Sequence, residues 1–217
     1  MAEEALKSTA AAPAADAAPA PVAAARAAGA IATLLSRHSV PALHLREPGP
    51  SDSQIDCALD AAVCAPDHGA LRPWRFVLIR GAARERLAEL FVRRMLERDP
   101  GTPPAKLDKA RHQPRTAPLV IAVGAHIRRE HKVPEIEQLL SSGAAVMNLL
   151  NAFHAQGFGA IWLTGGNAYD RQVAEQLGFG PEEQLLGFVY VGSIGALPQG
   201  VRPPRPPRAS VAREWGG

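Results

Sequence analysis

Residues 65–79, APDHGALRPWRFVLI, combine an Asp-His pair, a glycine and a Pro-Trp pair within one short connection. A plain connection between a helix and a strand needs only a glycine or proline to set the backbone and a few polar groups that meet water. Here the titratable side chains of Asp67 and His68 precede an aromatic residue, Trp74, that follows a proline. The pattern predicts a turn shaped to hold a ligand, with Trp74 serving for packing.

Motifs that perform chemistry with side chains alone are absent from the sequence. A dinucleotide fingerprint or phosphate loop needs glycines directly after a strand, whereas those of residues 157–162, GFGAIW, precede one. The sequence has no HExxH motif, no second cysteine pair for zinc and no Gly-x-Ser-x-Gly elbow. We expect no metal site, because the candidate ligands straddle a loop: His126, Glu130, His131 and Glu135. These absences favour a binding module or an enzyme whose cofactor carries the reaction.

The two cysteines, Cys57 and Cys64, are seven residues apart in CALDAAVC. On a helix this spacing puts both on one face. The distance between them is too long for a disulfide, and thiols of the cytosol stay reduced. We expect both side chains to be small residues of the core.

Composition separates one domain from two terminal segments. Residues 1–26 are mostly Ala and Pro, with almost no large apolar side chain to bury, which predicts a disordered tail. Residues 27–200 are long enough for one domain with a core. Residues 201–217 are rich in proline and arginine, and the pattern leaves open whether they form a solvated tail or an extended arm.

The net charge and the hydropathy of the sequence limit the classes of partner that the protein is expected to bind. The net charge is +3, and the sequence has no basic stripe with interleaved aromatic residues, so we expect no nucleic-acid partner. No run reaches the roughly 18 to 20 apolar residues of a membrane-spanning helix, and no secretory signal is visible. The expected location is the cytoplasm, without a membrane partner.

Hydrophobic periodicity predicts five helices and four strands. The expected helices are 28–37, 51–65, 82–98, 135–157 and 168–179, and the expected strands are 75–81, 118–126, 158–165 and 184–194. The Pro-rich segment 99–117 is expected to be a loop or lid with one short helix in it. Alternating strands and helices predict an α/β domain of three layers. Helix 135–157 has few charges, so it must be buried centrally or against a second subunit.

Set in order, several stretches of this sequence resemble the nitroreductase family of FMN-dependent oxidoreductases, over residues 28–195. The similarity is strongest to its small, single-domain NAD(P)H nitroreductase subgroup. The stretches that carry it are SRHSV (36–40), APDHGALRPWRFVLI (65–79), KAR (109–111), APLVIAV (117–123), EHKVPEIEQ (130–138), GAAVMNLLNAFHAQGFGAIWLTG (143–165) and LLGFVYVG (185–192). Each stretch alone is weak, but their combination and order are specific.

The resemblance implies a three-layer α/β (α+β) fold with a mixed central sheet flanked by helices. It also implies a homodimer with FMN at the subunit interface, in which the C-terminal arm, residues 201–217, is exchanged between subunits. Proline spacing in that arm favours an extended, pre-ordered segment.

The site residues are carried over where the motifs match. Arg37 and Ser39 are expected to hold the FMN phosphate, since a guanidinium forks onto phosphate oxygens and a hydroxyl adds a donor. His38 is expected beside the flavin. The remaining expected cofactor-binding residues are His68 and Cys64 near the opening turn, Trp162, Leu163 and Thr164 against the isoalloxazine, and Arg202 and Arg205 of the arm near the phosphate. Cys64 departs from the family, whose members carry an arginine there.

The implied activity is reduction of nitroaromatic, quinone or similar electron-poor acceptors by a ping-pong hydride transfer, with NAD(P)H as co-substrate. No catalytic side chain is expected, because flavin N5 carries the chemistry. Two alternatives stay open: a flavin-binding or storage protein with little turnover, and another flavin-dependent reductive reaction on the same scaffold. The Pro-rich segment 99–118 is where the acceptor would be selected.

Overall fold

The computed structural model describes residues 21–196 and 204–216. They belong to two units, residues 1–36 and residues 37–217. The described part of the first unit is helix α1 (Pro21–Ser36), which begins inside the range 1–26 predicted as a disordered tail. Alanine has the highest helix propensity and proline suits the first helical turn, so this segment forms a helix with little apolar bulk to bury.

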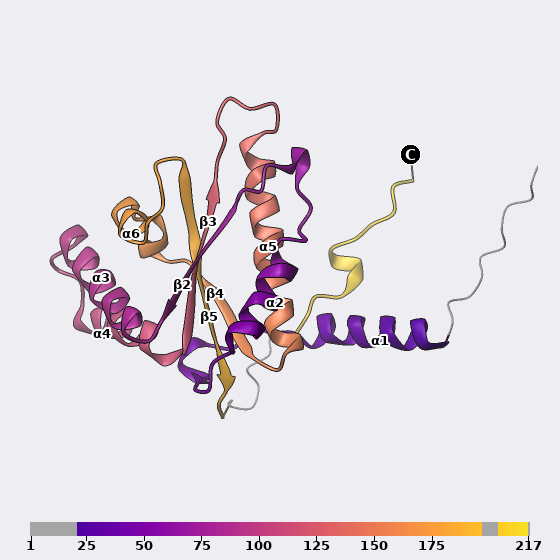
Figure 1. Cartoon of the computed structure of the whole chain (residues 1–217), viewed down its shortest axis with the longest axis horizontal. Helices are drawn as coiled ribbons and strands as arrows, with labels where there is room; N and C mark the ends of the chain where they lie inside the picture. The colour runs from indigo at the N-terminus through magenta and orange to yellow at the C-terminus, as the bar shows by residue number, and fades with distance from the viewer. Residues whose placement is uncertain (1–20, 197–203, 217) are drawn as a thin grey trace, which may run out of the picture. The chain divides into compact units, whose positions relative to one another are not determined.

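The second unit is one sheet covered by helices on both faces (Figure 1). The strands are β1 (Leu45–Arg46), β2 (Trp74–Arg80), β3 (Leu119–His126), β4 (Gly159–Leu163) and β5 (Glu183–Ile194). The helices are α2 (Asp52–Ala62), α3 (Ala82–Arg98), α4 (Pro104–Thr116), α5 (Glu135–Ala155) and α6 (Arg171–Gln176). None of the helices in the described part of the chain is long and apolar enough to span a bilayer.

The sheet has the order β1-β5-β3-β2, and β4 also pairs with β5. All four strand pairs among the described residues are antiparallel, which corrects the expectation of a mixed sheet. The reason lies in the connections. Two helices, α3 and α4, separate β2 from β3 and bring the chain back antiparallel. Strand β3 precedes α5 in the sequence and β4 follows it, and the two strands run in the same direction. They do not pair with each other, because β5 lies between them and is antiparallel to both.

The expected three-layer architecture is confirmed. Figure 1 shows α2 and α5 on one face of the sheet and α3, α4 and α6 on the other. Alternating side chains of β3 serve the two layers: Leu119, Ile121 and Val123 join the core under α2 and α5, whereas Val120 and Ala122 join the core under α3, α4 and α6. A strand that is buried on both faces therefore reads as a continuous apolar run.

Local signals explain most element boundaries. Helix α2 begins with a capping box, in which the Ser51 hydroxyl accepts from Gln54 N–H while the Gln54 side chain accepts from Ser51 N–H. Helix α3 has the predicted range. The Pro-rich segment differs, since it forms the 13-residue helix α4 rather than a loop with one short helix. Its first proline occupies the first turn, where no N–H is needed, and Pro114 lies in its last turn.

The prediction for the cysteines is wrong. Cys57 and Cys64 are both exposed and unpaired by any disulfide in the described part of the chain. The buried face of α2 carries Ile55, Ala58 and Ala62, which pack toward α5. Helix α2 ends at Ala62, so Cys64 lies in the turn after it, whereas Cys57 is on the exposed side of the helix.

Candidate functional site

The SRHSV segment begins with the last residue of α1, Ser36, and its Val40 is attached to strand β4. The backbone N–H of Val40 donates to the carbonyl oxygen of Ala160 at 3.0 Å. The neighbouring Gly159 has no side chain, and a Cβ there would lie 3.2 Å from the Cβ of Val40. This close approach holds residues 37–39 beside the start of β4.

Arg37 brings an unsatisfied donor to this place. Its Nε is buried and has no hydrogen-bond partner among the described residues, although the residue as a whole is only half-buried. Arg205 Nη2 donates to the carbonyl oxygen of Arg37 at 2.7 Å, so a second guanidinium lies next to the first. Burial, and then the charge of Arg205, lower the pKa of the Arg37 guanidinium. Two adjacent cations with a buried, unused donor form a site suited to an anion.

The other predicted residues of this segment surround the same place. His38 is half-buried and Ser39 is exposed. Arg202, predicted with Arg205, lies outside the described residues. Of the predicted phosphate-binding set, the structure brings together Arg37 and Arg205, and Ser39 follows in the same segment.

The end of β4 presents its residues to both faces of the sheet. Ala160 belongs to the core under α5, and the alternation of the strand puts Trp162 on that side and Leu163 on the α4 side. Trp162 is 37% exposed and covers Gly187 of β5. A Cβ at Gly187 would lie 2.6 Å from Trp162 Nε1, and the φ of +137° at Gly187 also favours glycine. The position of the indole therefore depends on a glycine.

A cavity of about 280 Å³ lies between α4, the end of β4 and the residues after SRHSV. We call it the α4–β4 cavity. It is lined by Pro41, Ala42, Leu43, Lys109, His112, Gln113, Thr116, Ile161 and Leu163. The α4 residues follow the spacing of one helix face. They were missed as individual site residues because the segment was expected to be mostly loop. The KAR stretch, which contains Lys109, was the signal that could have found them.

A second cavity of about 190 Å³ adjoins the first between α3, α4 and the segment after β4. We call it the α3–α4 cavity. The two cavities share Lys109, Gln113 and Leu163 as lining residues. The second one adds Lys106 of α4 and Thr164, which the sequence predicted as a site residue. The predicted Leu163 and Thr164 therefore do line a hollow.

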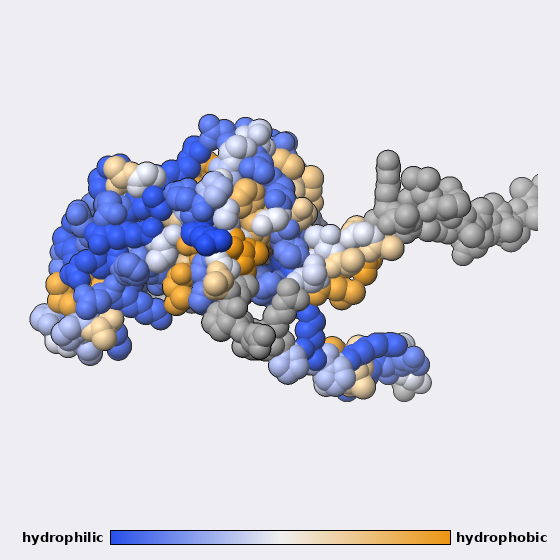
Figure 2. All heavy atoms as spheres, turned by 90° about the horizontal axis from the view of Figure 1, so that it is seen from below, coloured by the Kyte–Doolittle hydropathy of each residue, from blue (hydrophilic) through white to orange (hydrophobic). Residues whose placement is uncertain are grey.

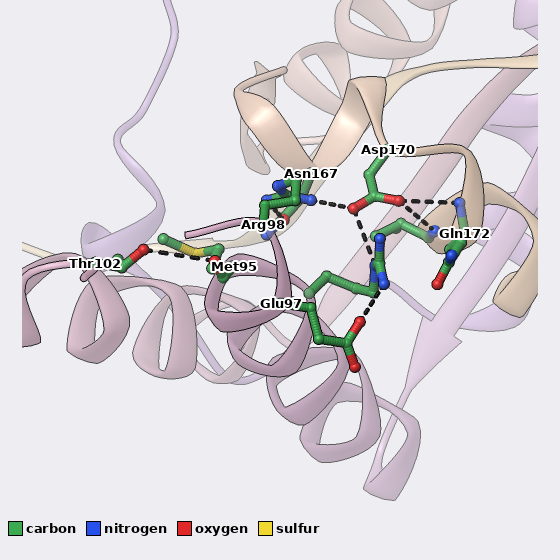
Figure 3. A network of polar contacts seen from close by, with 9 residues as sticks. Met95, Glu97, Arg98, Thr102, Asn167, Asp170 and Gln172 are labelled. Atoms are coloured by element: carbon green, nitrogen blue, oxygen red, sulfur yellow. Dashed lines mark hydrogen bonds and ion pairs between the residues drawn. The ribbon is translucent and has the colours of Figure 1, made fainter. Parts of the chain in front are cut away.

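The segment that closes this second cavity is anchored by a buried carboxylate (Figure 3). The side chain of Asp170 is 4% exposed and accepts from Arg94 Nε at 3.0 Å and from Arg98. Arg98 Nη2 also donates to Asn167 Oδ1 at 2.7 Å, and Asn167 lines the cavity. Asp170 also caps α6 through Gln172 N–H at 2.9 Å. Burial would raise the pKa of Asp170, but hydrogen bonds from two arginines and a backbone N–H outweigh it and lower that pKa.

Cys64 and His68 lie elsewhere in the chain. Their neighbours Ala62 and Ala65 belong to the core under α2 and α5, whereas Val40, next to the SRHSV residues, belongs to the core on the opposite face. His68 Nδ1 pairs with Glu137 Oε2 of α5 at 2.7 Å. Within one chain these two residues are therefore on a different layer from the α4–β4 cavity.

The turn that contains His68 is strongly constrained. Arg72 N–H donates to Asp67 Oδ2 at 2.7 Å, and φ is positive at Gly69, Ala70 and Arg72. The carbonyl oxygen of Pro73 accepts from His126 N–H at 2.7 Å. Trp74 packs against the core under α2 and α5, as predicted. Left-handed backbone at two non-glycine residues is unusual, and it is maintained here by contacts on both sides of the turn.

The sequence of this chain is similar to a family of known proteins. The model of the nitroreductase family matches residues 34–193. The chain is 38% identical over 164 residues to "Putative NAD(P)H nitroreductase YdjA" of Escherichia coli (strain K12), covering 76% of this chain and 87% of that protein.

Two solved structures have a similar fold. A nitroreductase-like family protein from Bacillus cereus superposes with a TM-score of 0.75 at 19% identity, over 87% of this chain and 96% of that one. A nitroreductase from Desulfovibrio desulfuricans in complex with FMN superposes with a TM-score of 0.66 at 23% identity, over 86% and 96%. Together with the matched motifs and the family model, these similarities lead to one conclusion: the chain belongs to the nitroreductase family.

Proposed function

We propose that this protein is an FMN-dependent oxidoreductase that uses NAD(P)H to reduce nitroaromatic, quinone or similar electron-poor acceptors. The observation that carries the proposal is the buried Nε of Arg37, which has no partner among the described residues and lies beside Arg205. Pro41, a few residues further along the chain, lines the α4–β4 cavity. Family membership supports the activity, because the E. coli relative is named an NAD(P)H nitroreductase and the D. desulfuricans structure contains FMN.

The residues present fit a flavin mononucleotide. One anion site, formed by Arg37, Ser39 and Arg205, suits the single phosphate of FMN, because charged hydrogen bonds to phosphate oxygens are among the stronger ones. Arg202 of the arm is the second candidate for this phosphate. Leu163 and Thr164 would contact the ring system on the α4 side of β4, and His38 would lie beside it. Within one chain Trp162 lies on the opposite face of β4 and lines neither cavity.

When bound, FMN supplies the chemistry, since its ring accepts a hydride from NAD(P)H and passes two electrons to the acceptor. Lys109 and His112 of α4 line the cavity and can place positive charge or donors beside the ring. A preorganised cation stabilises the negative charge that reduction adds, and it needs no reorganisation during the reaction. Leu163 and Ile161 provide the apolar wall against which a flat ring packs.

A ping-pong order follows from one open site that serves two partners in turn. The nicotinamide leaves as NAD(P)⁺ before the acceptor enters. For a nitroaromatic acceptor the balance is NAD(P)H plus H⁺ plus Ar–NO₂ giving NAD(P)⁺, Ar–NO and water. For a quinone, the same two electrons and two protons give the hydroquinone. We assign no side chain as an acid or base in these steps.

We further propose a homodimer with the flavin at the subunit interface. Helix α5 carries a stripe of large apolar side chains on its outer surface, and Ile136, Leu140 and Met147 are 59%, 65% and 41% exposed. The face of the molecule seen in Figure 2 is mostly hydrophilic, with a few separate hydrophobic patches. A long apolar stripe on the main helix suits a subunit contact. A second copy docked there would have its own His68, which pairs with Glu137 of α5, at the same interface.

Turnover tests this proposal. The purified holoenzyme should oxidise NADH or NADPH faster when a quinone or a nitroaromatic is added, and double-reciprocal plots at several acceptor concentrations should be parallel. A protein that holds FMN but shows no acceptor-dependent oxidation of either nucleotide would instead support a flavin-binding or storage role. A panel of halogenated and other reducible acceptors would reveal a different reductive reaction.

A further inference from the structure

Lysine is rare in this chain, and its distribution is uneven. Only four of the 24 lysines and arginines are lysine, namely Lys7, Lys106, Lys109 and Lys132. The salt bridges among the described residues use arginine, apart from that of His68. Two of the four lysines, Lys106 and Lys109, are one turn apart on α4 and both line the α3–α4 cavity. Half of the lysines therefore gather at one hollow.

These two ammonium groups are not neutralised by nearby carboxylates. Among the described residues, neither Lys106 nor Lys109 forms an ion pair. The only acidic residue of α4, Asp108, pairs with Arg111 at 2.8 Å on the same helix. Among the described residues, no Asp or Glu lines either the α3–α4 or the α4–β4 cavity. The positive charge at this place is thus left for a ligand.

Not every hollow of the molecule combines positive charge with a lack of acidic lining residues. A hollow of about 270 Å³ at the start of β5 carries both signs of charge, with Arg129 and Arg171 next to Glu182 and Glu183. Its charges are largely satisfied, because Arg171 pairs with Glu175 and Arg129 with Glu182. The two cavities of α4 differ from this hollow in having lysine and no acidic residue among their described lining residues.

The walls of the α3–α4 cavity suit an aromatic ring. Phe91, Met95, Phe188 and Tyr190 line it, and Phe91 and Phe188 pack edge to face with ring centroids 5.0 Å apart. Aromatic and thioether side chains pack well against a flat ring. The lysines lie on α4 at the exposed side of this apolar wall. A ligand that fits both features has an aromatic body and a negatively charged substituent.

We infer that the α3–α4 cavity selects anionic aromatic acceptors, such as nitrobenzoates or quinone carboxylates, and that Lys106 is the residue that recognises the carboxylate. This inference rests on the proposed function and names the substrate class of the same site. Lys109 lines both cavities, so it serves the cofactor side as well. Lys106 lines only the α3–α4 cavity and is therefore the specificity residue. For 4-nitrobenzoate, NAD(P)H and H⁺ are consumed, and 4-nitrosobenzoate, NAD(P)⁺ and water are formed.

The test compares two acceptors that differ only in charge. With the FMN-loaded protein at low salt, KM should be lower for 4-nitrobenzoate than for neutral 4-nitrobenzamide. Lys106→Gln should raise KM for the benzoate by about three- to tenfold, the range of one partly exposed charged contact. KM for the benzamide should stay within about twofold. Raising the ionic strength should reduce the preference, because exposed charges are screened. Lys132→Gln removes the same charge outside both cavities and should change neither value.

Binding gives a readout that does not depend on turnover. Benzoate, which cannot be reduced, should perturb the visible spectrum of the holoenzyme, and Lys106→Glu should weaken its binding more than Lys106→Gln does. Equal KM values for the two acceptors, together with unchanged benzoate binding in both variants, would overturn the inference. Absence of acceptor-dependent NAD(P)H oxidation with both compounds would instead count against the proposed function, and benzoate binding would still decide the role of Lys106.

Discussion

The two helical layers of this protein differ in how their polar and apolar groups are used. The layer of α3, α4 and α6 holds the buried Asp170 network and two cavities with lysines and no acidic lining residue. The layer of α2 and α5 packs closely against the sheet through apolar residues, yet α5 leaves Ile136 and Leu140 exposed on its outer surface. The two layers of one sheet therefore carry different surfaces, with lysine-lined cavities on one side and an exposed apolar helix face on the other.

Removing the C-terminal arm should have the largest effect. Deletion of residues 201–217 removes Arg205, whose guanidinium contacts Arg37, together with Arg202 and the exposed Trp215. We expect loss of FMN and a shift from dimer toward monomer or aggregate, since the arm would serve both the phosphate site and the partner subunit. Light scattering and the flavin content check this. A truncated protein that remains dimeric with its full flavin content would show that the arm is only a tail.

A charge on the outer surface of α5 should separate the subunits. Leu140→Glu places a carboxylate in the proposed interface, where burial of a leucine side chain contributes about 1.5 to 3 kcal/mol. We expect the variant to be monomeric at concentrations where the wild type is dimeric. The matched change Leu78→Glu alters a partly exposed leucine of β2 away from this stripe and should leave the dimer intact. Equal masses for wild type and Leu140→Glu by sedimentation would exclude this surface as the interface.

In the layer of α3, α4 and α6, a substitution at Asp170 should lower the free energy of unfolding. Asp170→Asn removes a buried carboxylate that two arginines share, and loss of one partner in a buried ion pair typically costs about 3 to 5 kcal/mol. The exposed pair of Asp108 with Arg111 provides the control, and Asp108→Asn should cost less than about 1 kcal/mol. Urea unfolding measures both. Similar losses for the two variants would show that the network does not anchor the segment after β4.

The pH dependence of this effect has a definite sign. The pKa of Asp170 is lower in the folded protein than its usual value near 3.8, so the unfolded chain binds more protons in that range. The stability from Asp170 is therefore fully present above about pH 4 and is lost as pH falls through the lowered folded-state pKa. Asp170→Asn should remove this part of the acid dependence.

The phosphate site should show a smaller but specific effect. Arg37→Ala should weaken FMN binding by roughly 2 kcal/mol, or about thirtyfold in Kd, the scale of losing one charged hydrogen-bonding partner. Arg37→Lys keeps the charge but removes the buried Nε donor, so it should rescue binding only in part. Fluorescence titration of the apoprotein with FMN measures the three affinities. An unchanged Kd for FMN in Arg37→Ala would show that the phosphate binds at another place in the protein.

Several features of the fold could be predicted from the sequence alone. Helix α3 and the continuous strand β3 followed from periodicity, and the packing role of Trp74 was also predicted. The direction of the strands could not be predicted, because the helical pair α3 and α4 was not recognised as two helices. Segment 99–117 contains several prolines, and pattern rules treat prolines as breaks even where a first-turn proline starts a helix.

The candidate site was predicted in part for similar reasons. Arg37, Leu163 and Thr164 came from motifs that are local in the sequence. The cavities depend on α4 packing beside β4, and no local pattern reports that juxtaposition. Cys64 and His68 also came from motifs, but one chain leaves them on the α2 and α5 layer. Whether a second copy completes the site is a property of the assembly, which sequence patterns do not encode directly.

The central claim is that Arg37, Ser39 and Arg205 hold the phosphate of a flavin mononucleotide beside the α4–β4 cavity. The most direct measurement is mass spectrometry of the small molecules released when the purified protein is denatured, combined with titration of the stripped protein. We expect a yellow protein that releases FMN rather than FAD and rebinds FMN stoichiometrically. A colourless protein that releases no flavin and fails to bind added FMN would contradict the claim.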